Sequence, residues 1–146
     1  MSSIIFIAAC SFVWTGFIGA ISFMESWLKF RAPNLSMPVG LSIGKLVFSA
    51  LNRVEWAFVI IISVSLFFYA SQIESILVVF FLIIILIVIV QTAWLLPALN
   101  KRAKAIISGK KILPSSNLHY YYVSLEFVKF LLLIFFGGGL LKSIIL

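Results

Sequence analysis

The stretch that decides the fold is ILVVFFLIIILIVIV, residues 76–90, in which no side chain carries a polar atom. After Gln91 and Thr92 the apolar character continues through residues 93–99. A helix on the surface of a soluble protein needs only one apolar face, whereas this run is apolar all round. It therefore indicates a helix that crosses a membrane.

Three further segments share this character. Residues 4–24 contain no charged side chain, and apolar residues also predominate in residues 56–70 and 118–143. We predict a single-domain, all-α protein over residues 1–146, in which four transmembrane helices form an up-down-up-down bundle. The expected helices cover about residues 4–30, 40–70, 73–99 and 118–143, with a loop at about 100–117. Residues 39–48 fit either an interfacial segment or part of the second helix.

Composition and charge exclude two protein classes. A chain that is 64% hydrophobic and 10% charged has too few polar residues to cover the surface of a small soluble domain. Its net charge of +7 does not indicate nucleic-acid binding, because the basic residues gather in two short connections rather than beside stacking aromatic residues. We expect membrane lipid, and no nucleic acid, as a partner.

The distribution of basic residues predicts the orientation in the membrane. Only Lys142 lies toward the termini, and the second connection, residues 71–75, has no Lys or Arg. By the positive-inside rule the first and third connections are cytoplasmic and both termini lie outside, as in a multi-pass protein of a bacterial inner membrane. Nine basic residues surround these two connections: Lys29, Arg31, Lys45, Arg53, Lys101, Arg102, Lys104, Lys110 and Lys111.

The third connection carries the densest basic cluster. We expect it to contact anionic lipid head groups, although docking to an acidic partner protein is the alternative. The cluster consists of Lys101, Arg102, Lys104, Lys110 and Lys111.

Strongly polar side chains lie at matching depths in different helices. Counted from the expected outer ends, Glu55, Gln91 and Glu126 each lie about fifteen residues, or about 22 Å, along their helices, and Glu25 lies about 31 Å along the first. An ionisable side chain that faces lipid costs at least a few kcal/mol, so these groups should face one another. We predict a polar interior that opens to the cytoplasmic side, and an apolar outer half.

Two helix faces extend this pattern. In the fourth helix, spacings of three and four residues place His119, Tyr122, Glu126 and Lys129 on one face, and the first helix has a similar stripe at Ser11, Thr15, Ser22, Glu25 and Lys29. Carboxylates and a histidine can act as acid-base or ligand groups, with the lysines as counter-charges. The candidate site for an ion, a proton or a small polar or amphipathic molecule comprises Glu25, Lys29, Glu55, Gln91, His119, Tyr122, Glu126 and Lys129.

The same residues also fit a packing role. Glu25 with Lys29, and Glu126 with Lys129, have the spacing of ion pairs within a helix, and Arg53 is a candidate partner for Glu55. In that alternative the protein is an accessory or scaffold subunit of a larger membrane complex. An interface with a partner protein is a further alternative, and a homo-oligomer or a larger membrane complex is a candidate assembly.

Other chemistries have weaker support. Glu25, Glu55, His119 and Glu126 form an oxygen-rich candidate set for a metal, but the Glu-x-x-His element of di-iron bundles is absent. A b-type haem needs a second axial ligand, and His119 is the only histidine. Nucleophilic catalysis is disfavoured because Cys10 lies in the opposite half of the membrane from His119. The sequence identifies no cofactor.

Several short motifs resemble a known family. They are FVWTGFIG at residues 12–19, Phe30-Arg31, Gly40-Leu41, Lys45-Leu46 with Phe48, Trp94-Leu95 with Pro97, and His119 in an aromatic setting. Their order and spacing resemble the small four-helix membrane proteins typified by transmembrane protein 205, across most of the chain. The resemblance implies a four-helix integral membrane protein and no established reaction.

Overall fold

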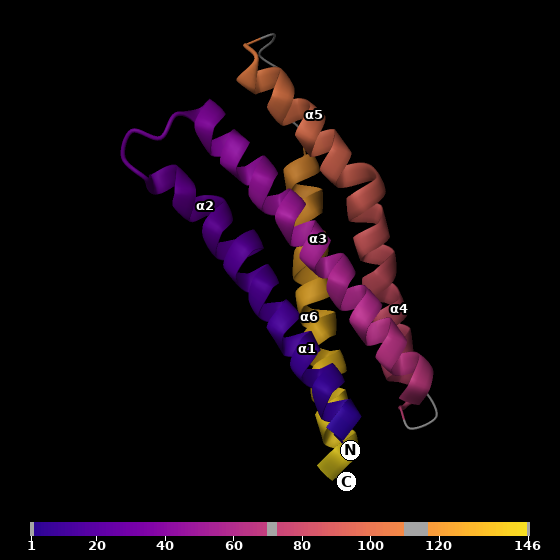
Figure 1. The fold of residues 1–146 in the computed structure, drawn as a ribbon. Coiled ribbons are helices and arrows are strands. Elements are labelled where there is room, and N and C mark those ends of the chain that lie inside the picture. The colour runs from indigo at the N-terminus through magenta and orange to yellow at the C-terminus, as the bar shows by residue number, and fades with distance from the viewer. Residues whose placement is uncertain (1, 70–72, 110–116, 146) are drawn as a thin grey trace.

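The computed structural model describes residues 2–69, 73–109 and 117–145, and helices make up nearly all of these ranges (Figure 1). Four helical stretches are long and apolar enough to cross a membrane: Ser2–Arg31, Met37–Tyr69, Ser75–Ile107 and Leu118–Ile145. Successive stretches run in opposite directions, and the N- and C-terminal ends lie together at one end of the bundle (Figure 1). The predicted all-α four-helix fold is confirmed.

Two of the four crossing stretches change their helical geometry midway. The second and fourth are single α-helices, whereas the first and third each contain a π-helical segment, η1 and η4. The elements are α1 Ser2–Ile18, η1 Gly19–Glu25, α2 Ser26–Leu28, the short 3₁₀ segment η2 Lys29–Arg31, α3 Met37–Tyr69, α4 Ser75–Val90, η4 Gln91–Leu95, α5 Leu96–Ile107 and α6 Leu118–Ile145.

The third crossing stretch is longer than the sequence indicated. The predicted end near residue 99 is wrong, because α5 continues to Ile107. Lys101, Arg102 and Lys104 are good helix formers, so the change to hydrophilic sequence ends the apolar segment without ending the helix. Pro97, which has no backbone N–H to donate, lies two residues after the last residue of the π-helical segment η4. Local π-helical geometry is one way in which a membrane helix accommodates a proline.

The position of residues 39–48 is also settled. They belong to α3, a continuous helix of 33 residues. At 1.5 Å per residue this helix is about 50 Å long, which exceeds the roughly 30 Å of a bilayer's hydrocarbon core. The helix is therefore long enough to extend into the head-group region as well as to cross the hydrocarbon.

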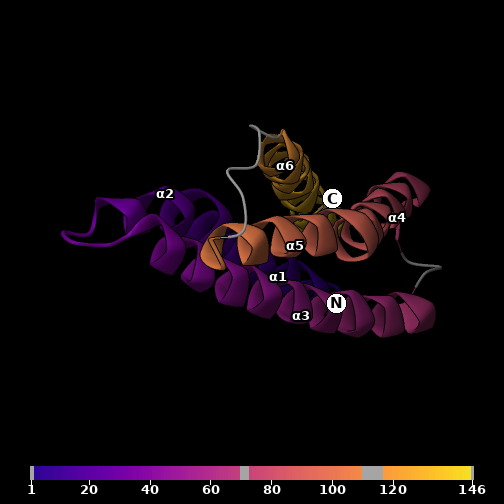
Figure 2. The ribbon, with the colours of Figure 1, turned by 90° about the horizontal axis from the view of Figure 1, so that it is seen from above.

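We use two names for the ends of the bundle. The terminal end holds Ser2, Ile145, the end of α3 and the start of α4, and the basic end holds the α2–α3 connection, the end of α5 and the start of α6 (Figures 1 and 2). The basic end is the one to which the sequence assigns nine of the eleven Lys and Arg residues.

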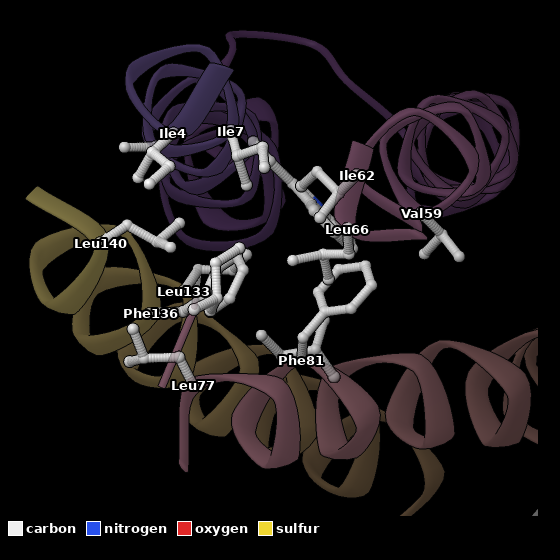
Figure 3. Close-up of a cluster of buried hydrophobic side chains, with 14 of the residues drawn as sticks. Ile4, Ile7, Val59, Ile62, Leu66, Leu77, Phe81, Leu133, Phe136 and Leu140 are labelled. Carbon is white, nitrogen blue, oxygen red and sulfur yellow. The ribbon is translucent and has the colours of Figure 1, made fainter. Parts of the chain in front are cut away.

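The apolar core occupies the half of the bundle near the terminal end. Ile7 of α1, Ile62 of α3, Ile84 of α4 and Leu133 of α6 are all fully buried. The rings of Phe81 and Phe136 stack with their centroids 5.5 Å apart. Figure 3 shows side chains from α1, α3, α4 and α6 converging in this cluster. The prediction of an apolar half at this end is confirmed.

A run of three glycines brings α6 close to its neighbours. A Cβ atom on Gly139 would lie 2.5 Å from Leu77 Cδ2, and one on Gly137 would lie 3.1 Å from Phe12 Cζ. A Cβ atom on Gly138 would meet no atom within 4 Å. Gly139 therefore permits close packing against α4, and Gly137 permits close packing against α1. Gly138 makes no such contact.

Candidate functional site

A fully buried lysine lies at the middle of the candidate site. Lys129, on α6, is 0% exposed. Its ammonium group donates to Gln91 Oε1 at 2.6 Å and to Glu126 Oε1 at 2.9 Å, and it forms an ion pair with Glu55 Oε1. A lysine has three N–H donors, so these three contacts account for all of them.

The Glu126 carboxylate has hydrogen bonds on both oxygens. Gln91 Nε2 donates to Oε1 at 2.7 Å, and Ser22 Oγ donates to Oε2 at 3.1 Å. Ser22 lies in η1 and Gln91 in η4, so both donors belong to π-helical segments. Such segments are often found at functional sites, because the wider turn redirects side chains.

The Glu55 carboxylate is only half satisfied. Its Oε1 atom pairs with Lys129 and accepts a hydrogen bond from Trp14 Nε1 at 3.2 Å. Its Oε2 atom is buried and has no hydrogen-bond partner among the described residues. The Trp14 ring in turn stacks on Phe58, with a centroid distance of 5.8 Å and an interplanar angle of 10°.

These contacts join all four crossing stretches. We call the three charged residues Glu55, Glu126 and Lys129, together with their neutral partners Trp14, Ser22 and Gln91, the buried centre. The matching depths of Glu55, Gln91 and Glu126 in the sequence predicted that these residues would meet, and the structure confirms it.

The buried centre has an uneven charge. Glu55, Glu126 and Lys129 are each 0% exposed, so water does not solvate them. If all three are ionised, the two carboxylates and one ammonium sum to −1. Burying an uncompensated charge is far more costly than burying a hydrogen-bonded neutral group. One further positive charge, which a proton would supply, makes the centre neutral.

A second polar cluster joins α3 to η4. Thr92 Oγ1 accepts hydrogen bonds from Asn52 Nδ2 and Trp56 Nε1, each at 2.9 Å. It also donates to the backbone oxygen of Val88 at 2.7 Å. Because all these groups are neutral, the cluster can stabilise helix packing without contributing to the charge of the buried centre.

The other predicted site residues lie nearer the basic end. Glu25 and Lys29 form their own ion pair at 3.1 Å, apart from the buried centre. His119 is exposed. Tyr122 is 1% exposed and adjoins the buried centre, because its side chain interacts with Glu126 and Glu55. Its ring packs edge-on against Phe48 at 5.2 Å.

Two ion pairs predicted from spacing are confirmed, and one proposed partner is wrong. Glu25 pairs with Lys29, and Glu126 pairs with Lys129. Glu55 pairs with Lys129 rather than with Arg53, which is exposed. Residues two apart on a helix point in different directions, so Arg53 cannot follow Glu55 into the interior.

The polar residues earlier in the first helix form bonds within that helix. Ser11 Oγ donates to the backbone oxygen of Ile7, and Thr15 Oγ1 donates to that of Ser11. The stripe predicted from spacing thus contributes only Ser22 to the buried centre.

The candidate metal ligands do not come together. Within residues 2–69, 73–109 and 117–145, no three His, Cys, Asp or Glu side chains are grouped so that they could hold a metal ion. Glu25 and His119 lie apart from the Glu55–Glu126 pair, and Lys129 fills the space between those two carboxylates.

A cavity of about 290 Å³ opens at the basic end. Its walls come from η2, α3, α5 and the start of α6, and they are mostly apolar. The charged and polar side chains that line it include Lys29, Lys45, Arg102 and His119. None of the four glutamates lines it. We call it the basic-end cavity.

Trp14 and the Thr92 cluster were not recognised as polar partners from the sequence. Trp14 and Trp56 lie within apolar segments rather than at the interface where tryptophan is enriched. A buried indole N–H usually has an acceptor, so a tryptophan in the middle of a membrane helix is a signal for a polar partner on another helix.

Comparison of the chain with protein-family models, with curated proteins and with solved structures gives no significant match.

Proposed function

We propose that this chain is a small multi-pass membrane protein that binds and releases one proton at the buried centre. The observation that carries the proposal is that two carboxylates and one ammonium are fully buried together, with no second cation in contact with them among the described residues. A bound proton removes the remaining charge. Release of that proton creates a charge in the protein interior, so proton occupancy must be linked to helix packing.

The geometry supports one atom as the proton acceptor. Glu126 accepts hydrogen bonds at both oxygens, and Glu55 Oε1 is occupied by Lys129 and Trp14. Glu55 Oε2 is the carboxylate oxygen of the centre that has no donor. A proton on this oxygen leaves every existing hydrogen bond of the centre in place.

The main alternative is a packing role in an accessory or scaffold subunit, with charges that never change. In that case the centre would hold four helices in register, as buried polar networks do in some proteins. The resemblance to the family typified by transmembrane protein 205 agrees with either role, because it implies a fold and no reaction.

The variant Glu55→Gln distinguishes these roles. Glutamine keeps an oxygen for Lys129 and Trp14, and it places a neutral group where Oε2 lies. The centre then holds one carboxylate and one ammonium, so it is neutral without a bound proton. We expect the variant to fold at least as stably as the wild type at neutral pH.

Two measurements follow the proton. The infrared spectrum of the wild type should contain the C=O stretch of a protonated carboxylic acid, which Glu55→Gln should lose. Because an unfolded glutamate is ionised at neutral pH, unfolding releases the proton, and the free energy of unfolding should fall as pH rises. The limiting slope for one proton is about 1.4 kcal/mol per pH unit.

Glu25→Gln is the matched control, because it makes the same substitution in an ion pair outside the buried centre. It should keep both the infrared band and the slope. His119 is present in all three proteins, so any pH dependence from this residue cancels in the comparison. Equal slopes and equal bands in the wild type and Glu55→Gln would contradict proton binding and support the packing role. If Na⁺ or K⁺, rather than acid, stabilises the wild type, then the ligand of the buried centre is a metal cation and not a proton.

A further inference from the structure

We propose that the basic-end cavity binds one anionic membrane lipid, with an acyl chain between the apolar walls and the head group at the cationic side chains. This site is separate from the buried centre, and it does not depend on proton binding there. Three observations support it: the chemistry of the lining, the shortage of acidic residues at this end of the chain, and the position of the cavity in the bundle.

The lining is amphipathic. Phe48, Leu96 and Ile106 are among the apolar side chains that form most of the walls, while Lys29 and Lys45 contribute ammonium groups. Apolar walls with a few cationic groups match a ligand that has a hydrocarbon part and an anionic head. A small inorganic anion would leave the apolar walls without a partner.

Acidic side chains are scarce at the basic end. The chain has only four acidic residues. Glu55 and Glu126 are buried with Lys129, and Glu74 is the N-cap residue of α4, at the terminal end. Glu25 is the remaining acidic residue of the chain, and it pairs with Lys29. Lys45 makes no ion pair with a described carboxylate.

Two glycines of α3 shape the cavity. Gly40 and Gly44 are buried, and a Cβ atom on Gly44 would lie 2.9 Å from Lys29 Nζ. A Cβ atom on Gly40 would overlap the Phe30 ring. The missing side chains therefore allow Lys29 and Phe30 to lie against α3. Lys29 Nζ is also 5.3 Å from the centroid of the Phe48 ring, which fixes the ammonium group beside the apolar wall.

The cavity also lies where a lipid head group is available. It is formed at the end of the bundle where α3 and α5 extend beyond the apolar core. At this level the head groups of one leaflet meet the protein, and an anionic head group gains about 1 kcal/mol for each nearby Lys or Arg. A lipid can enter from the leaflet without crossing the aqueous phase.

The test measures lipid retention by the full-length protein. The protein is delipidated in mild detergent, titrated with phosphatidylglycerol or phosphatidylcholine, and analysed by native mass spectrometry. We expect one phosphatidylglycerol molecule per chain to be retained in preference to phosphatidylcholine. Lys45→Gln should weaken that binding about fivefold, which corresponds to the loss of one lysine near the head group.

Matched variants separate the cavity from general surface charge. Lys104 is exposed and does not line the cavity, so Lys104→Gln should change the affinity by less than about twofold. Ala103 lines the cavity and Ala105 does not. Ala103→Phe should fill the apolar part and abolish one-to-one retention, whereas Ala105→Phe should preserve it.

Three outcomes would overturn the proposal. One is equal retention of the zwitterionic and anionic lipids, and another is an equal loss of binding in Lys45→Gln and Lys104→Gln. The third is displacement of the lipid by inorganic phosphate alone, which would assign the cations to a soluble anion. Failure of these tests leaves proton binding unaffected, because Glu55→Gln alters neither the cavity lining nor its charge.

Discussion

Ser22 and Gln91 lie in the π-helical segments of two different crossing helices, and they donate hydrogen bonds to the two oxygens of the same carboxylate, Glu126. The irregular turns of the first and third crossing stretches thus meet at one side chain of the fourth. Glu126 in turn pairs with Lys129, which contacts Glu55 on α3. A regular α-helix at either π-helical segment would present a different side chain at this depth.

Replacement of Lys129 by methionine should be the most destabilising single change in the buried centre. It leaves two carboxylates buried without their cation, and breaking a buried pair in this way costs about 3–5 kcal/mol. Reversible unfolding in detergent measures the loss. The triple variant Glu55→Gln, Glu126→Gln, Lys129→Met removes every charge and should recover most of the stability. If the triple variant were no more stable than Lys129→Met, the loss would come from packing rather than from unpaired charge.

Thr92→Val should weaken the attachment of α3 to η4. The substitution keeps the shape of the side chain but removes the oxygen that accepts from Asn52 and Trp56. Interhelical hydrogen bonds in membranes contribute about 0.6 kcal/mol on average, so the expected loss of unfolding free energy is about 1–2 kcal/mol. Thr15→Val is the control, because Thr15 donates only to Ser11 of its own helix. Equal losses in the two variants would contradict the role of Thr92 as an interhelical contact.

Two neighbouring glycines of α6 should respond differently to alanine. Gly138→Ala meets open space, and it should raise the free energy of unfolding by up to about 1 kcal/mol because alanine is the better helix former. Gly139→Ala places its methyl group against Leu77, so that side chain must move and the gain should be lost. Thermal unfolding of both variants compares them directly. A similar gain in both would show that α4 and α6 are not in close contact at this position.

Cysteine labelling tests the orientation in the membrane. The positive-inside rule places Lys104 in the cytoplasm and Glu74 outside. In a Cys10→Ser background, a membrane-impermeant thiol reagent added to intact cells should label Glu74→Cys and leave Lys104→Cys unlabelled until the cells are opened. Both positions are exposed, so the difference reports the side of the membrane. The reverse pattern would invert the predicted topology.

The sequence predicted those features that depend on hydrophobic length and on depth. Residues 76–90 identified a membrane helix because no polar residue interrupts them. The shared depth of Glu55, Gln91 and Glu126 correctly predicted that these three side chains meet. Depth alone does not fix rotation about a helix axis, so Arg53 was wrongly proposed as the partner of Glu55. The π-helical segments bring Ser22 and Gln91 to Glu126; Pro97 follows η4 in the sequence, whereas η1 has no comparable sequence signal.

The end of α5 shows a second limit of sequence interpretation. Charged residues after Leu99 mark the end of the apolar segment, and we equated that point with the end of the helix. Helix formation and membrane solvation are separate preferences, and lysine and arginine satisfy the first outside the hydrocarbon. Hydropathy therefore marked the end of the apolar segment and missed the eight further helical residues, 100–107.

The depth of Lys129 and its two carboxylates has an electrical consequence. These groups lie partway along helices that are long enough to cross a bilayer, so a charge that reaches them from either side passes through only part of the transmembrane potential. Moving one elementary charge through the whole potential changes its energy by about 2.3 kcal/mol per 100 mV. If Glu55 binds a proton as proposed, its proton occupancy should respond to voltage as well as to pH.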